Sequence, residues 1–183
     1  PRLQSCPRAD GASALIVCSP AMARRAGARV AVRAATLLSG DYENPQDMAR
    51  WRTDREGAAK AYELAGVGPG ELDVVECHDA FSIAEILHYE ALGLCAHGEG
   101  GRLVAEGATA LGGRLPVNVS GGLISRGHPI AATGVEQIVE IARHLRGIAG
   151  ERQVPGARVG LAHCMGGDRA GDAKSMTVAI LSS

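Results

Sequence analysis

The chain has 183 residues and a net charge of −1; 46% of its residues are hydrophobic and only 3% are aromatic. This length and composition predict one sizeable globular domain with an aliphatic core. The balanced charge and the scarcity of rings argue against binding to nucleic acid and against a polybasic membrane patch. No apolar run approaches the roughly 20 residues that a membrane-spanning helix needs, and the first residues do not resemble a signal peptide.

The cysteines are five in number and scattered: Cys6, Cys18, Cys77, Cys95 and Cys164. An odd, dispersed set indicates reduced thiols and a cytoplasmic location. No pair has the spacing of a zinc site, and adjacent Cys and His residues on a strand point to opposite faces. We therefore expect no bound metal.

Hydrophobic periodicity and capping residues predict strands and helices that alternate along the chain. The expected elements are a buried strand at 14–18, a helix at 21–26, strands at 28–38 and 72–77, helices at 53–65 and 79–92, a strand at 117–120, a helix at 131–145, and strands at 158–163 and 174–181. Ser19 is expected to cap the first helix, and Thr53 to open a capping box. Residues 93–113 are glycine-rich, with one possible helical turn at 103–106, and 164–173 are expected to form a loop. This alternation favours an α/β fold with helices covering the sheet.

Three polar motifs follow expected strands. They are His78-Asp79-Ala80-Phe81, Gly127-His128-Pro129 and His163-Cys164-Met165-Gly166-Gly167. Strand ends are where α/β proteins keep their sites. Each histidine alone is more often a structural turn residue. Two imidazoles, a thiol and a glycine-rich backbone together form a plausible set for acyl chemistry.

These motifs resemble those of the thiolases, most closely the sterol-carrier-protein or lipid-transfer type. The first begins with His-Asp, as in that branch. The second continues Gly-His-Pro-Ile-Ala-Ala-Thr-Gly and is similar to the family's Gly-His-Pro-Ile-Gly-Ala-Thr-Gly, with Ala131 in place of the usual glycine. The third is similar to the family's Cys-x-Gly-Gly motif. The resemblance covers nearly the whole chain from Asp10 onward.

The resemblance implies the C-terminal half of the thiolase fold, a mixed sheet covered by helices, with the last strand of the N-terminal half added. Residues 1–27 would be the remnant of that N-terminal half, and 28–183 the C-terminal domain. In the family the reactive cysteine lies in the N-terminal half, and nothing in this sequence matches it. The resemblance therefore implies that an upstream half or a partner chain completes the site, in a homo-oligomer. The 183-residue chain alone is expected to be inactive.

The resemblance also implies residue roles. His78 and His128 would donate hydrogen bonds to a thioester carbonyl, and His128 would also activate the missing nucleophile. Cys164 would be the acid and base at the α carbon, the alternative being a buried packing thiol. The Gly166 N–H would bind the acyl-enzyme oxygen. Phe81 would either fill the core below the site or line the pantetheine channel.

The implied activity is that of an acyl-CoA acyltransferase similar to acetyl-CoA acetyltransferase, with coenzyme A as substrate and no bound cofactor. It would cleave 3-oxoacyl-CoA, or run the reverse Claisen condensation, in lipid or sterol metabolism. Two alternatives stay open: a thiolase-fold retro-aldolase that acts on steroid side-chain CoA thioesters with a partner protein, and a non-catalytic domain that binds lipid or dimerises. Asp79 is expected to cap its own helix and His144 to lie near solvent. No partner is assigned to His88, His97 or His163.

Overall fold

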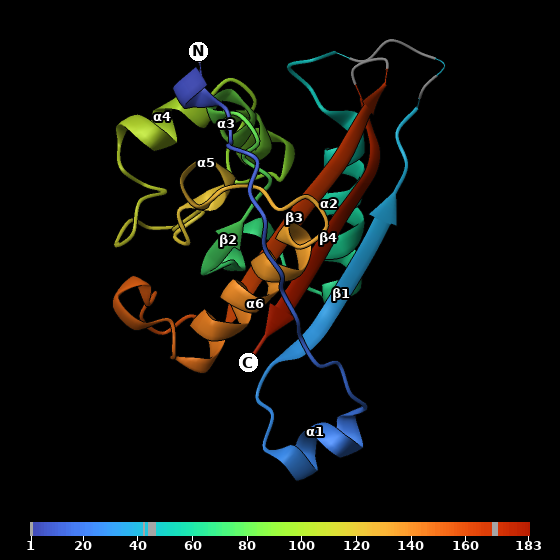
Figure 1. Cartoon of the computed structure of the whole chain (residues 1–183), viewed down its shortest axis with the longest axis vertical. Coiled ribbons are helices and arrows are strands. Elements are labelled where there is room, and N and C mark those ends of the chain that lie inside the picture. The colour runs from blue at the N-terminus through green and yellow to red at the C-terminus, as the bar shows by residue number, and fades with distance from the viewer. Residues whose placement is uncertain (1, 42, 44–46, 170–171) are drawn as a thin grey trace.

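The computed structural model describes residues 2–41, 43, 47–169 and 172–183, and its centre is a four-stranded mixed sheet (Figure 1). The strand order is β1 (Ala31–Leu38), β4 (Asp172–Ser182), β3 (Val159–Arg169) and β2 (Val74–Glu76). β4 runs antiparallel to both of its neighbours, whereas β2 runs parallel to β3. The α/β fold with a mixed sheet predicted from the sequence is confirmed.

Helices cover both faces of the sheet. α2 (Arg52–Ala65) contacts β1, β4 and α3 (Ser82–Ala91), while α6 (Thr133–Arg146) contacts β3, β2 and β4. The alternation along β4 shows that these are opposite faces, because neighbouring strand residues point to opposite sides. Val178 and Ile180 pack in the cluster that contains the alanines of α2, and Leu181 packs with Ile141 of α6. In Figure 1, α6 lies in front of the strands and α2 behind them.

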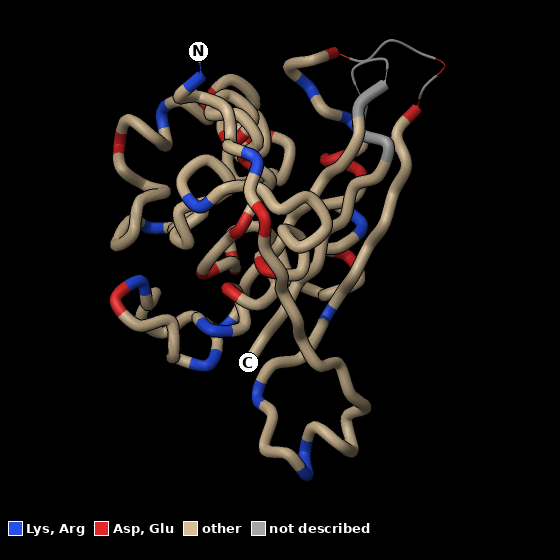
Figure 2. Tube along the Cα trace, viewed as in Figure 1, with Lys and Arg blue, Asp and Glu red and all other residues tan. Residues whose placement is uncertain are grey.

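Short helices and turns make up the rest of the described chain. They are α1 (Pro20–Ala26), α4 (Gly100–Ala105), α5 (Gly122–Arg126) and 3₁₀ turns at Arg2–Gln4, Pro69–Glu71 and Gly150–Arg152. As predicted, Ser19 caps α1 by accepting the N–H of Met22, and Gly27 ends the helix in the left-handed conformation. Within the described residues, no helix is long and apolar enough to span a membrane. Basic and acidic residues are interspersed along the trace (Figure 2).

The expected buried strand at Ala14–Cys18 is wrong. These residues form no strand, and the side chain of Ile16 is 94% exposed. A strand needs a neighbouring strand to satisfy its N–H and C=O groups, and in the structure of this chain the run pairs with none. The strand that the resemblance assigned to the N-terminal half is therefore only an apolar segment here.

Three further expectations are corrected. α2 begins at Arg52 with Trp51 at the N-cap position, so no capping box forms at Thr53. The expected strand at 117–120 is a single bridge between Val117 and Val75. β3 does not end before Cys164 but continues to Arg169, because its pairing with β4 persists beyond the motif. Residues 170 and 171 of the expected loop lie outside the described residues.

Candidate active site

The pairing of β2 with β3 brings the first and third motifs together. In this parallel pair Glu76 lies opposite Ala162. His78 and Cys164 each follow two residues later, at the same edge of the sheet. Nδ1 of His78 lies 3.5 Å from Sγ of Cys164, within hydrogen-bond distance for sulfur. The structure thus places an imidazole and a thiol in contact.

His128 joins them from the segment between α5 and α6. Its ring is edge-on to that of His78, with 5.1 Å between the ring centroids. The N-terminal residues hold this segment, since the His128 N–H donates to the carbonyl of Pro7 at 2.9 Å. They also bind the first motif, where the Cys6 N–H donates to the carbonyl of Ala80 at 2.9 Å. The three residues predicted from the motifs, His78, His128 and Cys164, therefore surround one place.

Thr133 fixes the tautomer of His128. The Thr133 hydroxyl donates to the carbonyl of Pro129 at 3.2 Å, so its oxygen accepts from Nδ1 of His128 at 2.8 Å. Nδ1 then carries the hydrogen and Nε2 has the lone pair. An imidazole in this tautomer is a base at Nε2 and becomes a donor there once it has accepted a proton.

Burial determines the charge state of His78 and Cys164. Burial, together with the charges of His163, His88 and His128, lowers the pKa of His78 to about 3, so the ring is neutral near pH 7. Burial raises the pKa of Cys164 to about 11, so the thiol keeps its hydrogen. Cys164 can donate this hydrogen to Nδ1 of His78. Nε2 of His78 is then left with an N–H to donate.

The thiol is also packed against α6. A Cβ added to Gly134 would lie 3.3 Å from Sγ of Cys164. A larger residue would displace the thiol or the helix by a few tenths of an ångström. Glycine at this position therefore allows the first turn of α6 to approach Cys164 closely.

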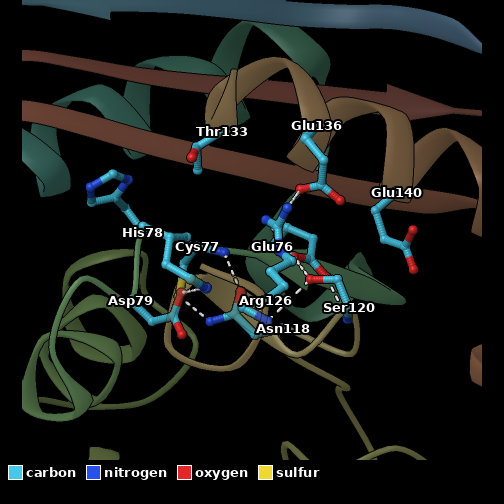
Figure 3. A network of polar contacts seen from close by, with 12 residues as sticks. Glu76, Cys77, His78, Asp79, Asn118, Ser120, Arg126, Thr133, Glu136 and Glu140 are labelled. Atoms are coloured by element: carbon cyan, nitrogen blue, oxygen red, sulfur yellow. Dashed lines mark hydrogen bonds and ion pairs between the residues drawn. The ribbon is translucent and has the colours of Figure 1, made fainter. Parts of the chain in front are cut away.

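A polar network joins the first and second motifs (Figure 3). The Cys77 N–H donates to Oδ1 of Asn118 at 2.8 Å. The carboxylate of Asp79 accepts the N–H groups of Leu123 at 2.7 Å and Ile124 at 3.3 Å. Asp79 therefore caps the start of α5, which is distant in sequence. The prediction that it caps the helix that follows it, α3, is wrong. The network fixes the segment that precedes His128 relative to the one that carries His78.

Two other predicted site residues lie at the surface. Phe81 is 55% exposed, so it is not the core filler that was one of its two expected roles; lining of a pantetheine channel stays a prediction. Gly166 lies in β3 opposite Ser175 and is exposed, within a strand and not in the expected loop. Its role as an oxyanion donor also stays a prediction.

A second cluster, of fully buried polar side chains, lies beneath His78. Asp54, His88 and His163 offer three potential metal ligand atoms within 4.8 Å of one another. The hydrogen bonds do not fit a three-ligand site, however. Nδ1 of His163 accepts the His78 N–H at 3.4 Å, so the hydrogen of the neutral ring is on Nε2, the atom that would have to ligate.

All three motifs lie within a region of the chain that matches a known protein family. A model of the family "Thiolase C-terminal domain-like" matches residues 23–183. The chain belongs to this thiolase family. The resemblance drawn from the motifs is therefore confirmed.

The thiolase relatives are longer proteins. The chain is 46% identical over 172 residues to sterol carrier protein 2 of Rattus norvegicus, a match that covers 90% of the chain and 31% of that protein. It is 45% identical over 170 residues to an acetyl-CoA acetyltransferase of Methanothermobacter thermautotrophicus, covering 91% of the chain and 44% of that protein. The chain thus spans less than half the length of these relatives.

Solved structures agree on the fold. An Ltp2-ChsH2(DUF35) aldolase matches with a TM-score of 0.72 over 84% of this chain and 39% of the other, at 24% sequence identity. At this identity the likeness concerns the thiolase fold alone. It does not distinguish a thiolase activity from an aldolase activity.

Proposed function

We propose that this thiolase domain supplies the histidines and the acid–base thiol of an active site that cleaves 3-oxoacyl-CoA with coenzyme A, or runs the reverse Claisen condensation. The observation that carries the proposal is the convergence of His78, His128 and Cys164, with the thiol 3.5 Å from one imidazole and the two rings 5.1 Å apart. A neutral donor, a base and a protonated thiol around one place are the groups that this acyl chemistry requires.

The two histidines have different tasks in this proposal. His78 remains neutral and donates its Nε2–H to the oxygen of the substrate's thioester carbonyl, which gains negative charge during the reaction. His128 first accepts the proton of a nucleophilic thiol at Nε2, and then donates that hydrogen to the same oxygen. Loss of one such donor costs about 2.7–4 kcal/mol of transition-state stabilisation.

Cys164 acts at the α carbon. When a nucleophilic thiolate attacks the 3-oxo group, the bond between the 2 and 3 carbons breaks and its electron pair stays on the α carbon of the departing acetyl-CoA. Cys164 donates its S–H proton to that carbon and becomes a thiolate. Coenzyme A then returns a proton to Cys164 as its own sulfur attacks the acyl-enzyme. The raised pKa keeps the thiol protonated for the first of these steps.

The nucleophile comes from outside this chain in our proposal, from an upstream thiolase half or a partner chain. The thiols of Cys6, Cys18, Cys77 and Cys95 have no hydrogen bond or ion pair to His128 among the contacts of the described residues. The full assembly would be a homo-oligomer that handles acyl-CoA in lipid or sterol metabolism. The sterol carrier protein 2 and acetyl-CoA acetyltransferase relatives support this choice.

The test is CoA-dependent cleavage of acetoacetyl-CoA by the chain together with an upstream thiolase half. We expect Cys164→Ser and His128→Ala each to reduce turnover by about 10²–10⁴-fold, the usual contribution of an acid or base. Cys95→Ser, in a partly exposed thiol after α3, serves as the control and should leave turnover unchanged. Cleavage of a 3-hydroxyacyl-CoA without coenzyme A would support the retro-aldolase alternative. Lipid binding or dimerisation without cleavage of either substrate would support the non-catalytic alternative.

A further inference from the structure

The buried cluster beneath His78 draws its three members from three elements. Asp54 comes from α2, His88 from α3 and His163 from β3, and each is at most 1% exposed. Oδ2 of Asp54 lies 2.9 Å from Nδ1 of His88 and 3.5 Å from Nε2 of His163. The centroids of the two imidazole rings lie 4.4 Å apart, and the centroid of the Trp51 ring lies 4.6 Å from that of His88.

Both imidazoles also bind the backbone of His78. The His78 N–H donates to Nδ1 of His163 at 3.4 Å, and the His78 carbonyl accepts from Nε2 of His88 at 3.0 Å. An amide N–H can only donate and a carbonyl can only accept, so each contact fixes a hydrogen on its ring. His163 carries its hydrogen on Nε2, facing Asp54, and His88 carries one on the nitrogen that faces His78.

The cluster holds one proton beyond the hydrogens that its bonds to His78 fix. Nδ1 of His88 and Oδ2 of Asp54 face each other across 2.9 Å and share one further proton, which leaves this pair neutral overall. Burial raises the pKa of Asp54, but the charges and hydrogen bonds of His163 and His88 outweigh it and hold that pKa below its usual range. Burial and the charge of His163 lower the pKa of His88 as well, so the proton is shared between the two groups and is not fixed on the imidazole.

Stability alone does not account for such a cluster. Replacing buried ionic groups by apolar residues of similar volume is often neutral or stabilising. What this cluster provides is geometry, because it binds both the N–H and the C=O of one residue, and that residue carries the ring in contact with Cys164.

We infer that Asp54, His88 and His163 are positioning residues that clamp the backbone of His78 and so hold its ring against Cys164 and His128. The inference rests on the proposed role of His78 in acyl-CoA cleavage. A displacement of about 1 Å in such a site can reduce the rate about 10²-fold. Loss of the clamp should therefore lower kcat by about 10–100-fold and leave KM nearly unchanged, because its three side chains are buried and offer no surface to a substrate.

The two rings allow reciprocal substitutions of similar size. An Asn side chain places its oxygen near the position of Nδ1, and a Gln side chain places its NH₂ near the position of Nε2. His163→Asn and His88→Gln should therefore keep the two bonds to His78, while His163→Gln and His88→Asn should lose them. His144→Gln is the control, because His144 is equally buried but accepts the N–H of Val154 on the other face of the sheet.

The first measurement is amide hydrogen exchange of His78 in the 183-residue chain. We expect His163→Gln to speed it at least about tenfold relative to His163→Asn, and His144→Gln to leave it unchanged. Equal exchange in the two His163 variants, or one equivalent of zinc retained by the dialysed wild type, would overturn the clamp whatever the activity.

The second measurement is kcat and KM for acetoacetyl-CoA with an upstream half supplied. The clamp predicts that His88→Gln retains the wild-type kcat and that His88→Asn does not. If the variants show the expected differences in exchange but the wild type never cleaves the substrate, the proposed function is refuted and the clamp is still supported.

Discussion

Glu76 and Ser120 are joined by two hydrogen bonds within the buried end of β2. Oε2 of Glu76 accepts the Ser120 hydroxyl at 2.6 Å, and Oε1 accepts the Ser120 N–H at 3.1 Å (Figure 3). Arg126 lies 4.0 Å away and also pairs with Glu136. Even so, burial raises the pKa of Glu76 from 4.5 to about 7.

This raised pKa makes a prediction for stability against pH. Between pH 4.5 and 7 the folded state keeps a proton on Glu76 that the unfolded chain has released, so stability from this group falls as pH rises through that window. The full loss is about 3 kcal/mol, because each pH unit between the unfolded and the folded pKa is worth about 1.4 kcal/mol. Glu76→Gln removes the titration and keeps an acceptor for Ser120. Urea unfolding at pH 5 and pH 8 should show the variant gaining stability relative to the wild type at the higher pH.

The matched control for this prediction is Glu151→Gln in the exposed 3₁₀ turn after α6. It should follow the wild-type dependence on pH. A difference in unfolding free energy between Glu76→Gln and wild type that stays constant from pH 5 to pH 8 would contradict the buried, protonated carboxyl.

The close approach of Gly134 to Cys164 predicts that a substitution here lowers activity more than stability. Ala is more favourable than Gly in a helix, by about 1 kcal/mol in the interior and by less in the first turn, where Gly134 lies, so Gly134→Ala should not lower the melting temperature much. The added methyl would lie 3.3 Å from Sγ of Cys164 and should displace the thiol by a few tenths of an ångström. We expect turnover, with an upstream half supplied, to fall severalfold or more. Gly101→Ala in α4, where the new methyl meets nothing within 4 Å, should be silent. Loss of folding in Gly134→Ala, or unchanged turnover, would count against this account.

The hydrogen bond between Thr133 and His128 predicts that the activity of His128 depends on the tautomer of its ring. Thr133→Val removes the oxygen that accepts from Nδ1, whereas Thr133→Ser retains it. For histidines that bind a metal, removal of the partner that orients the ring typically costs about 10–100-fold in activity. We expect a loss of the same order for Thr133→Val and near wild-type turnover for Thr133→Ser. Nitrogen chemical shifts of His128 should show the hydrogen on Nδ1 in the wild type and in Thr133→Ser. Finding it on Nε2 in the wild type would contradict the proposed role as base.

The order of elements and the convergence of His78, His128 and Cys164 could be predicted from the sequence, because each depends on local patterns and on motifs at strand ends. The strand at Ala14–Cys18 could not, since an apolar run indicates burial but does not say whether a pairing partner is present. The length of β3 was missed for the opposite reason. Glycines at 166 and 167 suggest a loop, but antiparallel pairing with β4 extends the strand through them.

The sequence contains a signal for the buried cluster. Asp54 falls on the helical face of Ala58, Ala61 and Ala65, and His88 on that of Ala84 and Ala91. A charged residue on an apolar face requires a buried partner. His144 was expected near solvent for want of the same argument, and is buried beside Glu140, which is 3.6 Å away. The packing of α2, α3 and β3 against one another decides which polar residues pair. A local sequence pattern does not contain this information.

The last prediction is that the 183-residue chain alone does not cleave acetoacetyl-CoA. The reaction needs a thiol to hold the acyl group between its two halves. In our proposal Cys164 serves as the acid and base, and its pKa is raised to about 11, so its thiol is a poor nucleophile near neutral pH. Cys6, which pairs through its N–H with Ala80, is the nearest alternative, but burial and the charge of Asp79 also raise its pKa. Effective molarities of well-oriented groups reach about 10⁵–10⁸ M, and a thiol outside the correct place loses most of that advantage. We expect cleavage to appear only when an upstream thiolase half is added, with turnover unchanged in Cys6→Ser and reduced by about 10²–10⁴-fold in His128→Ala. Turnover by the chain alone that disappears in Cys164→Ser would instead make Cys164 the nucleophile.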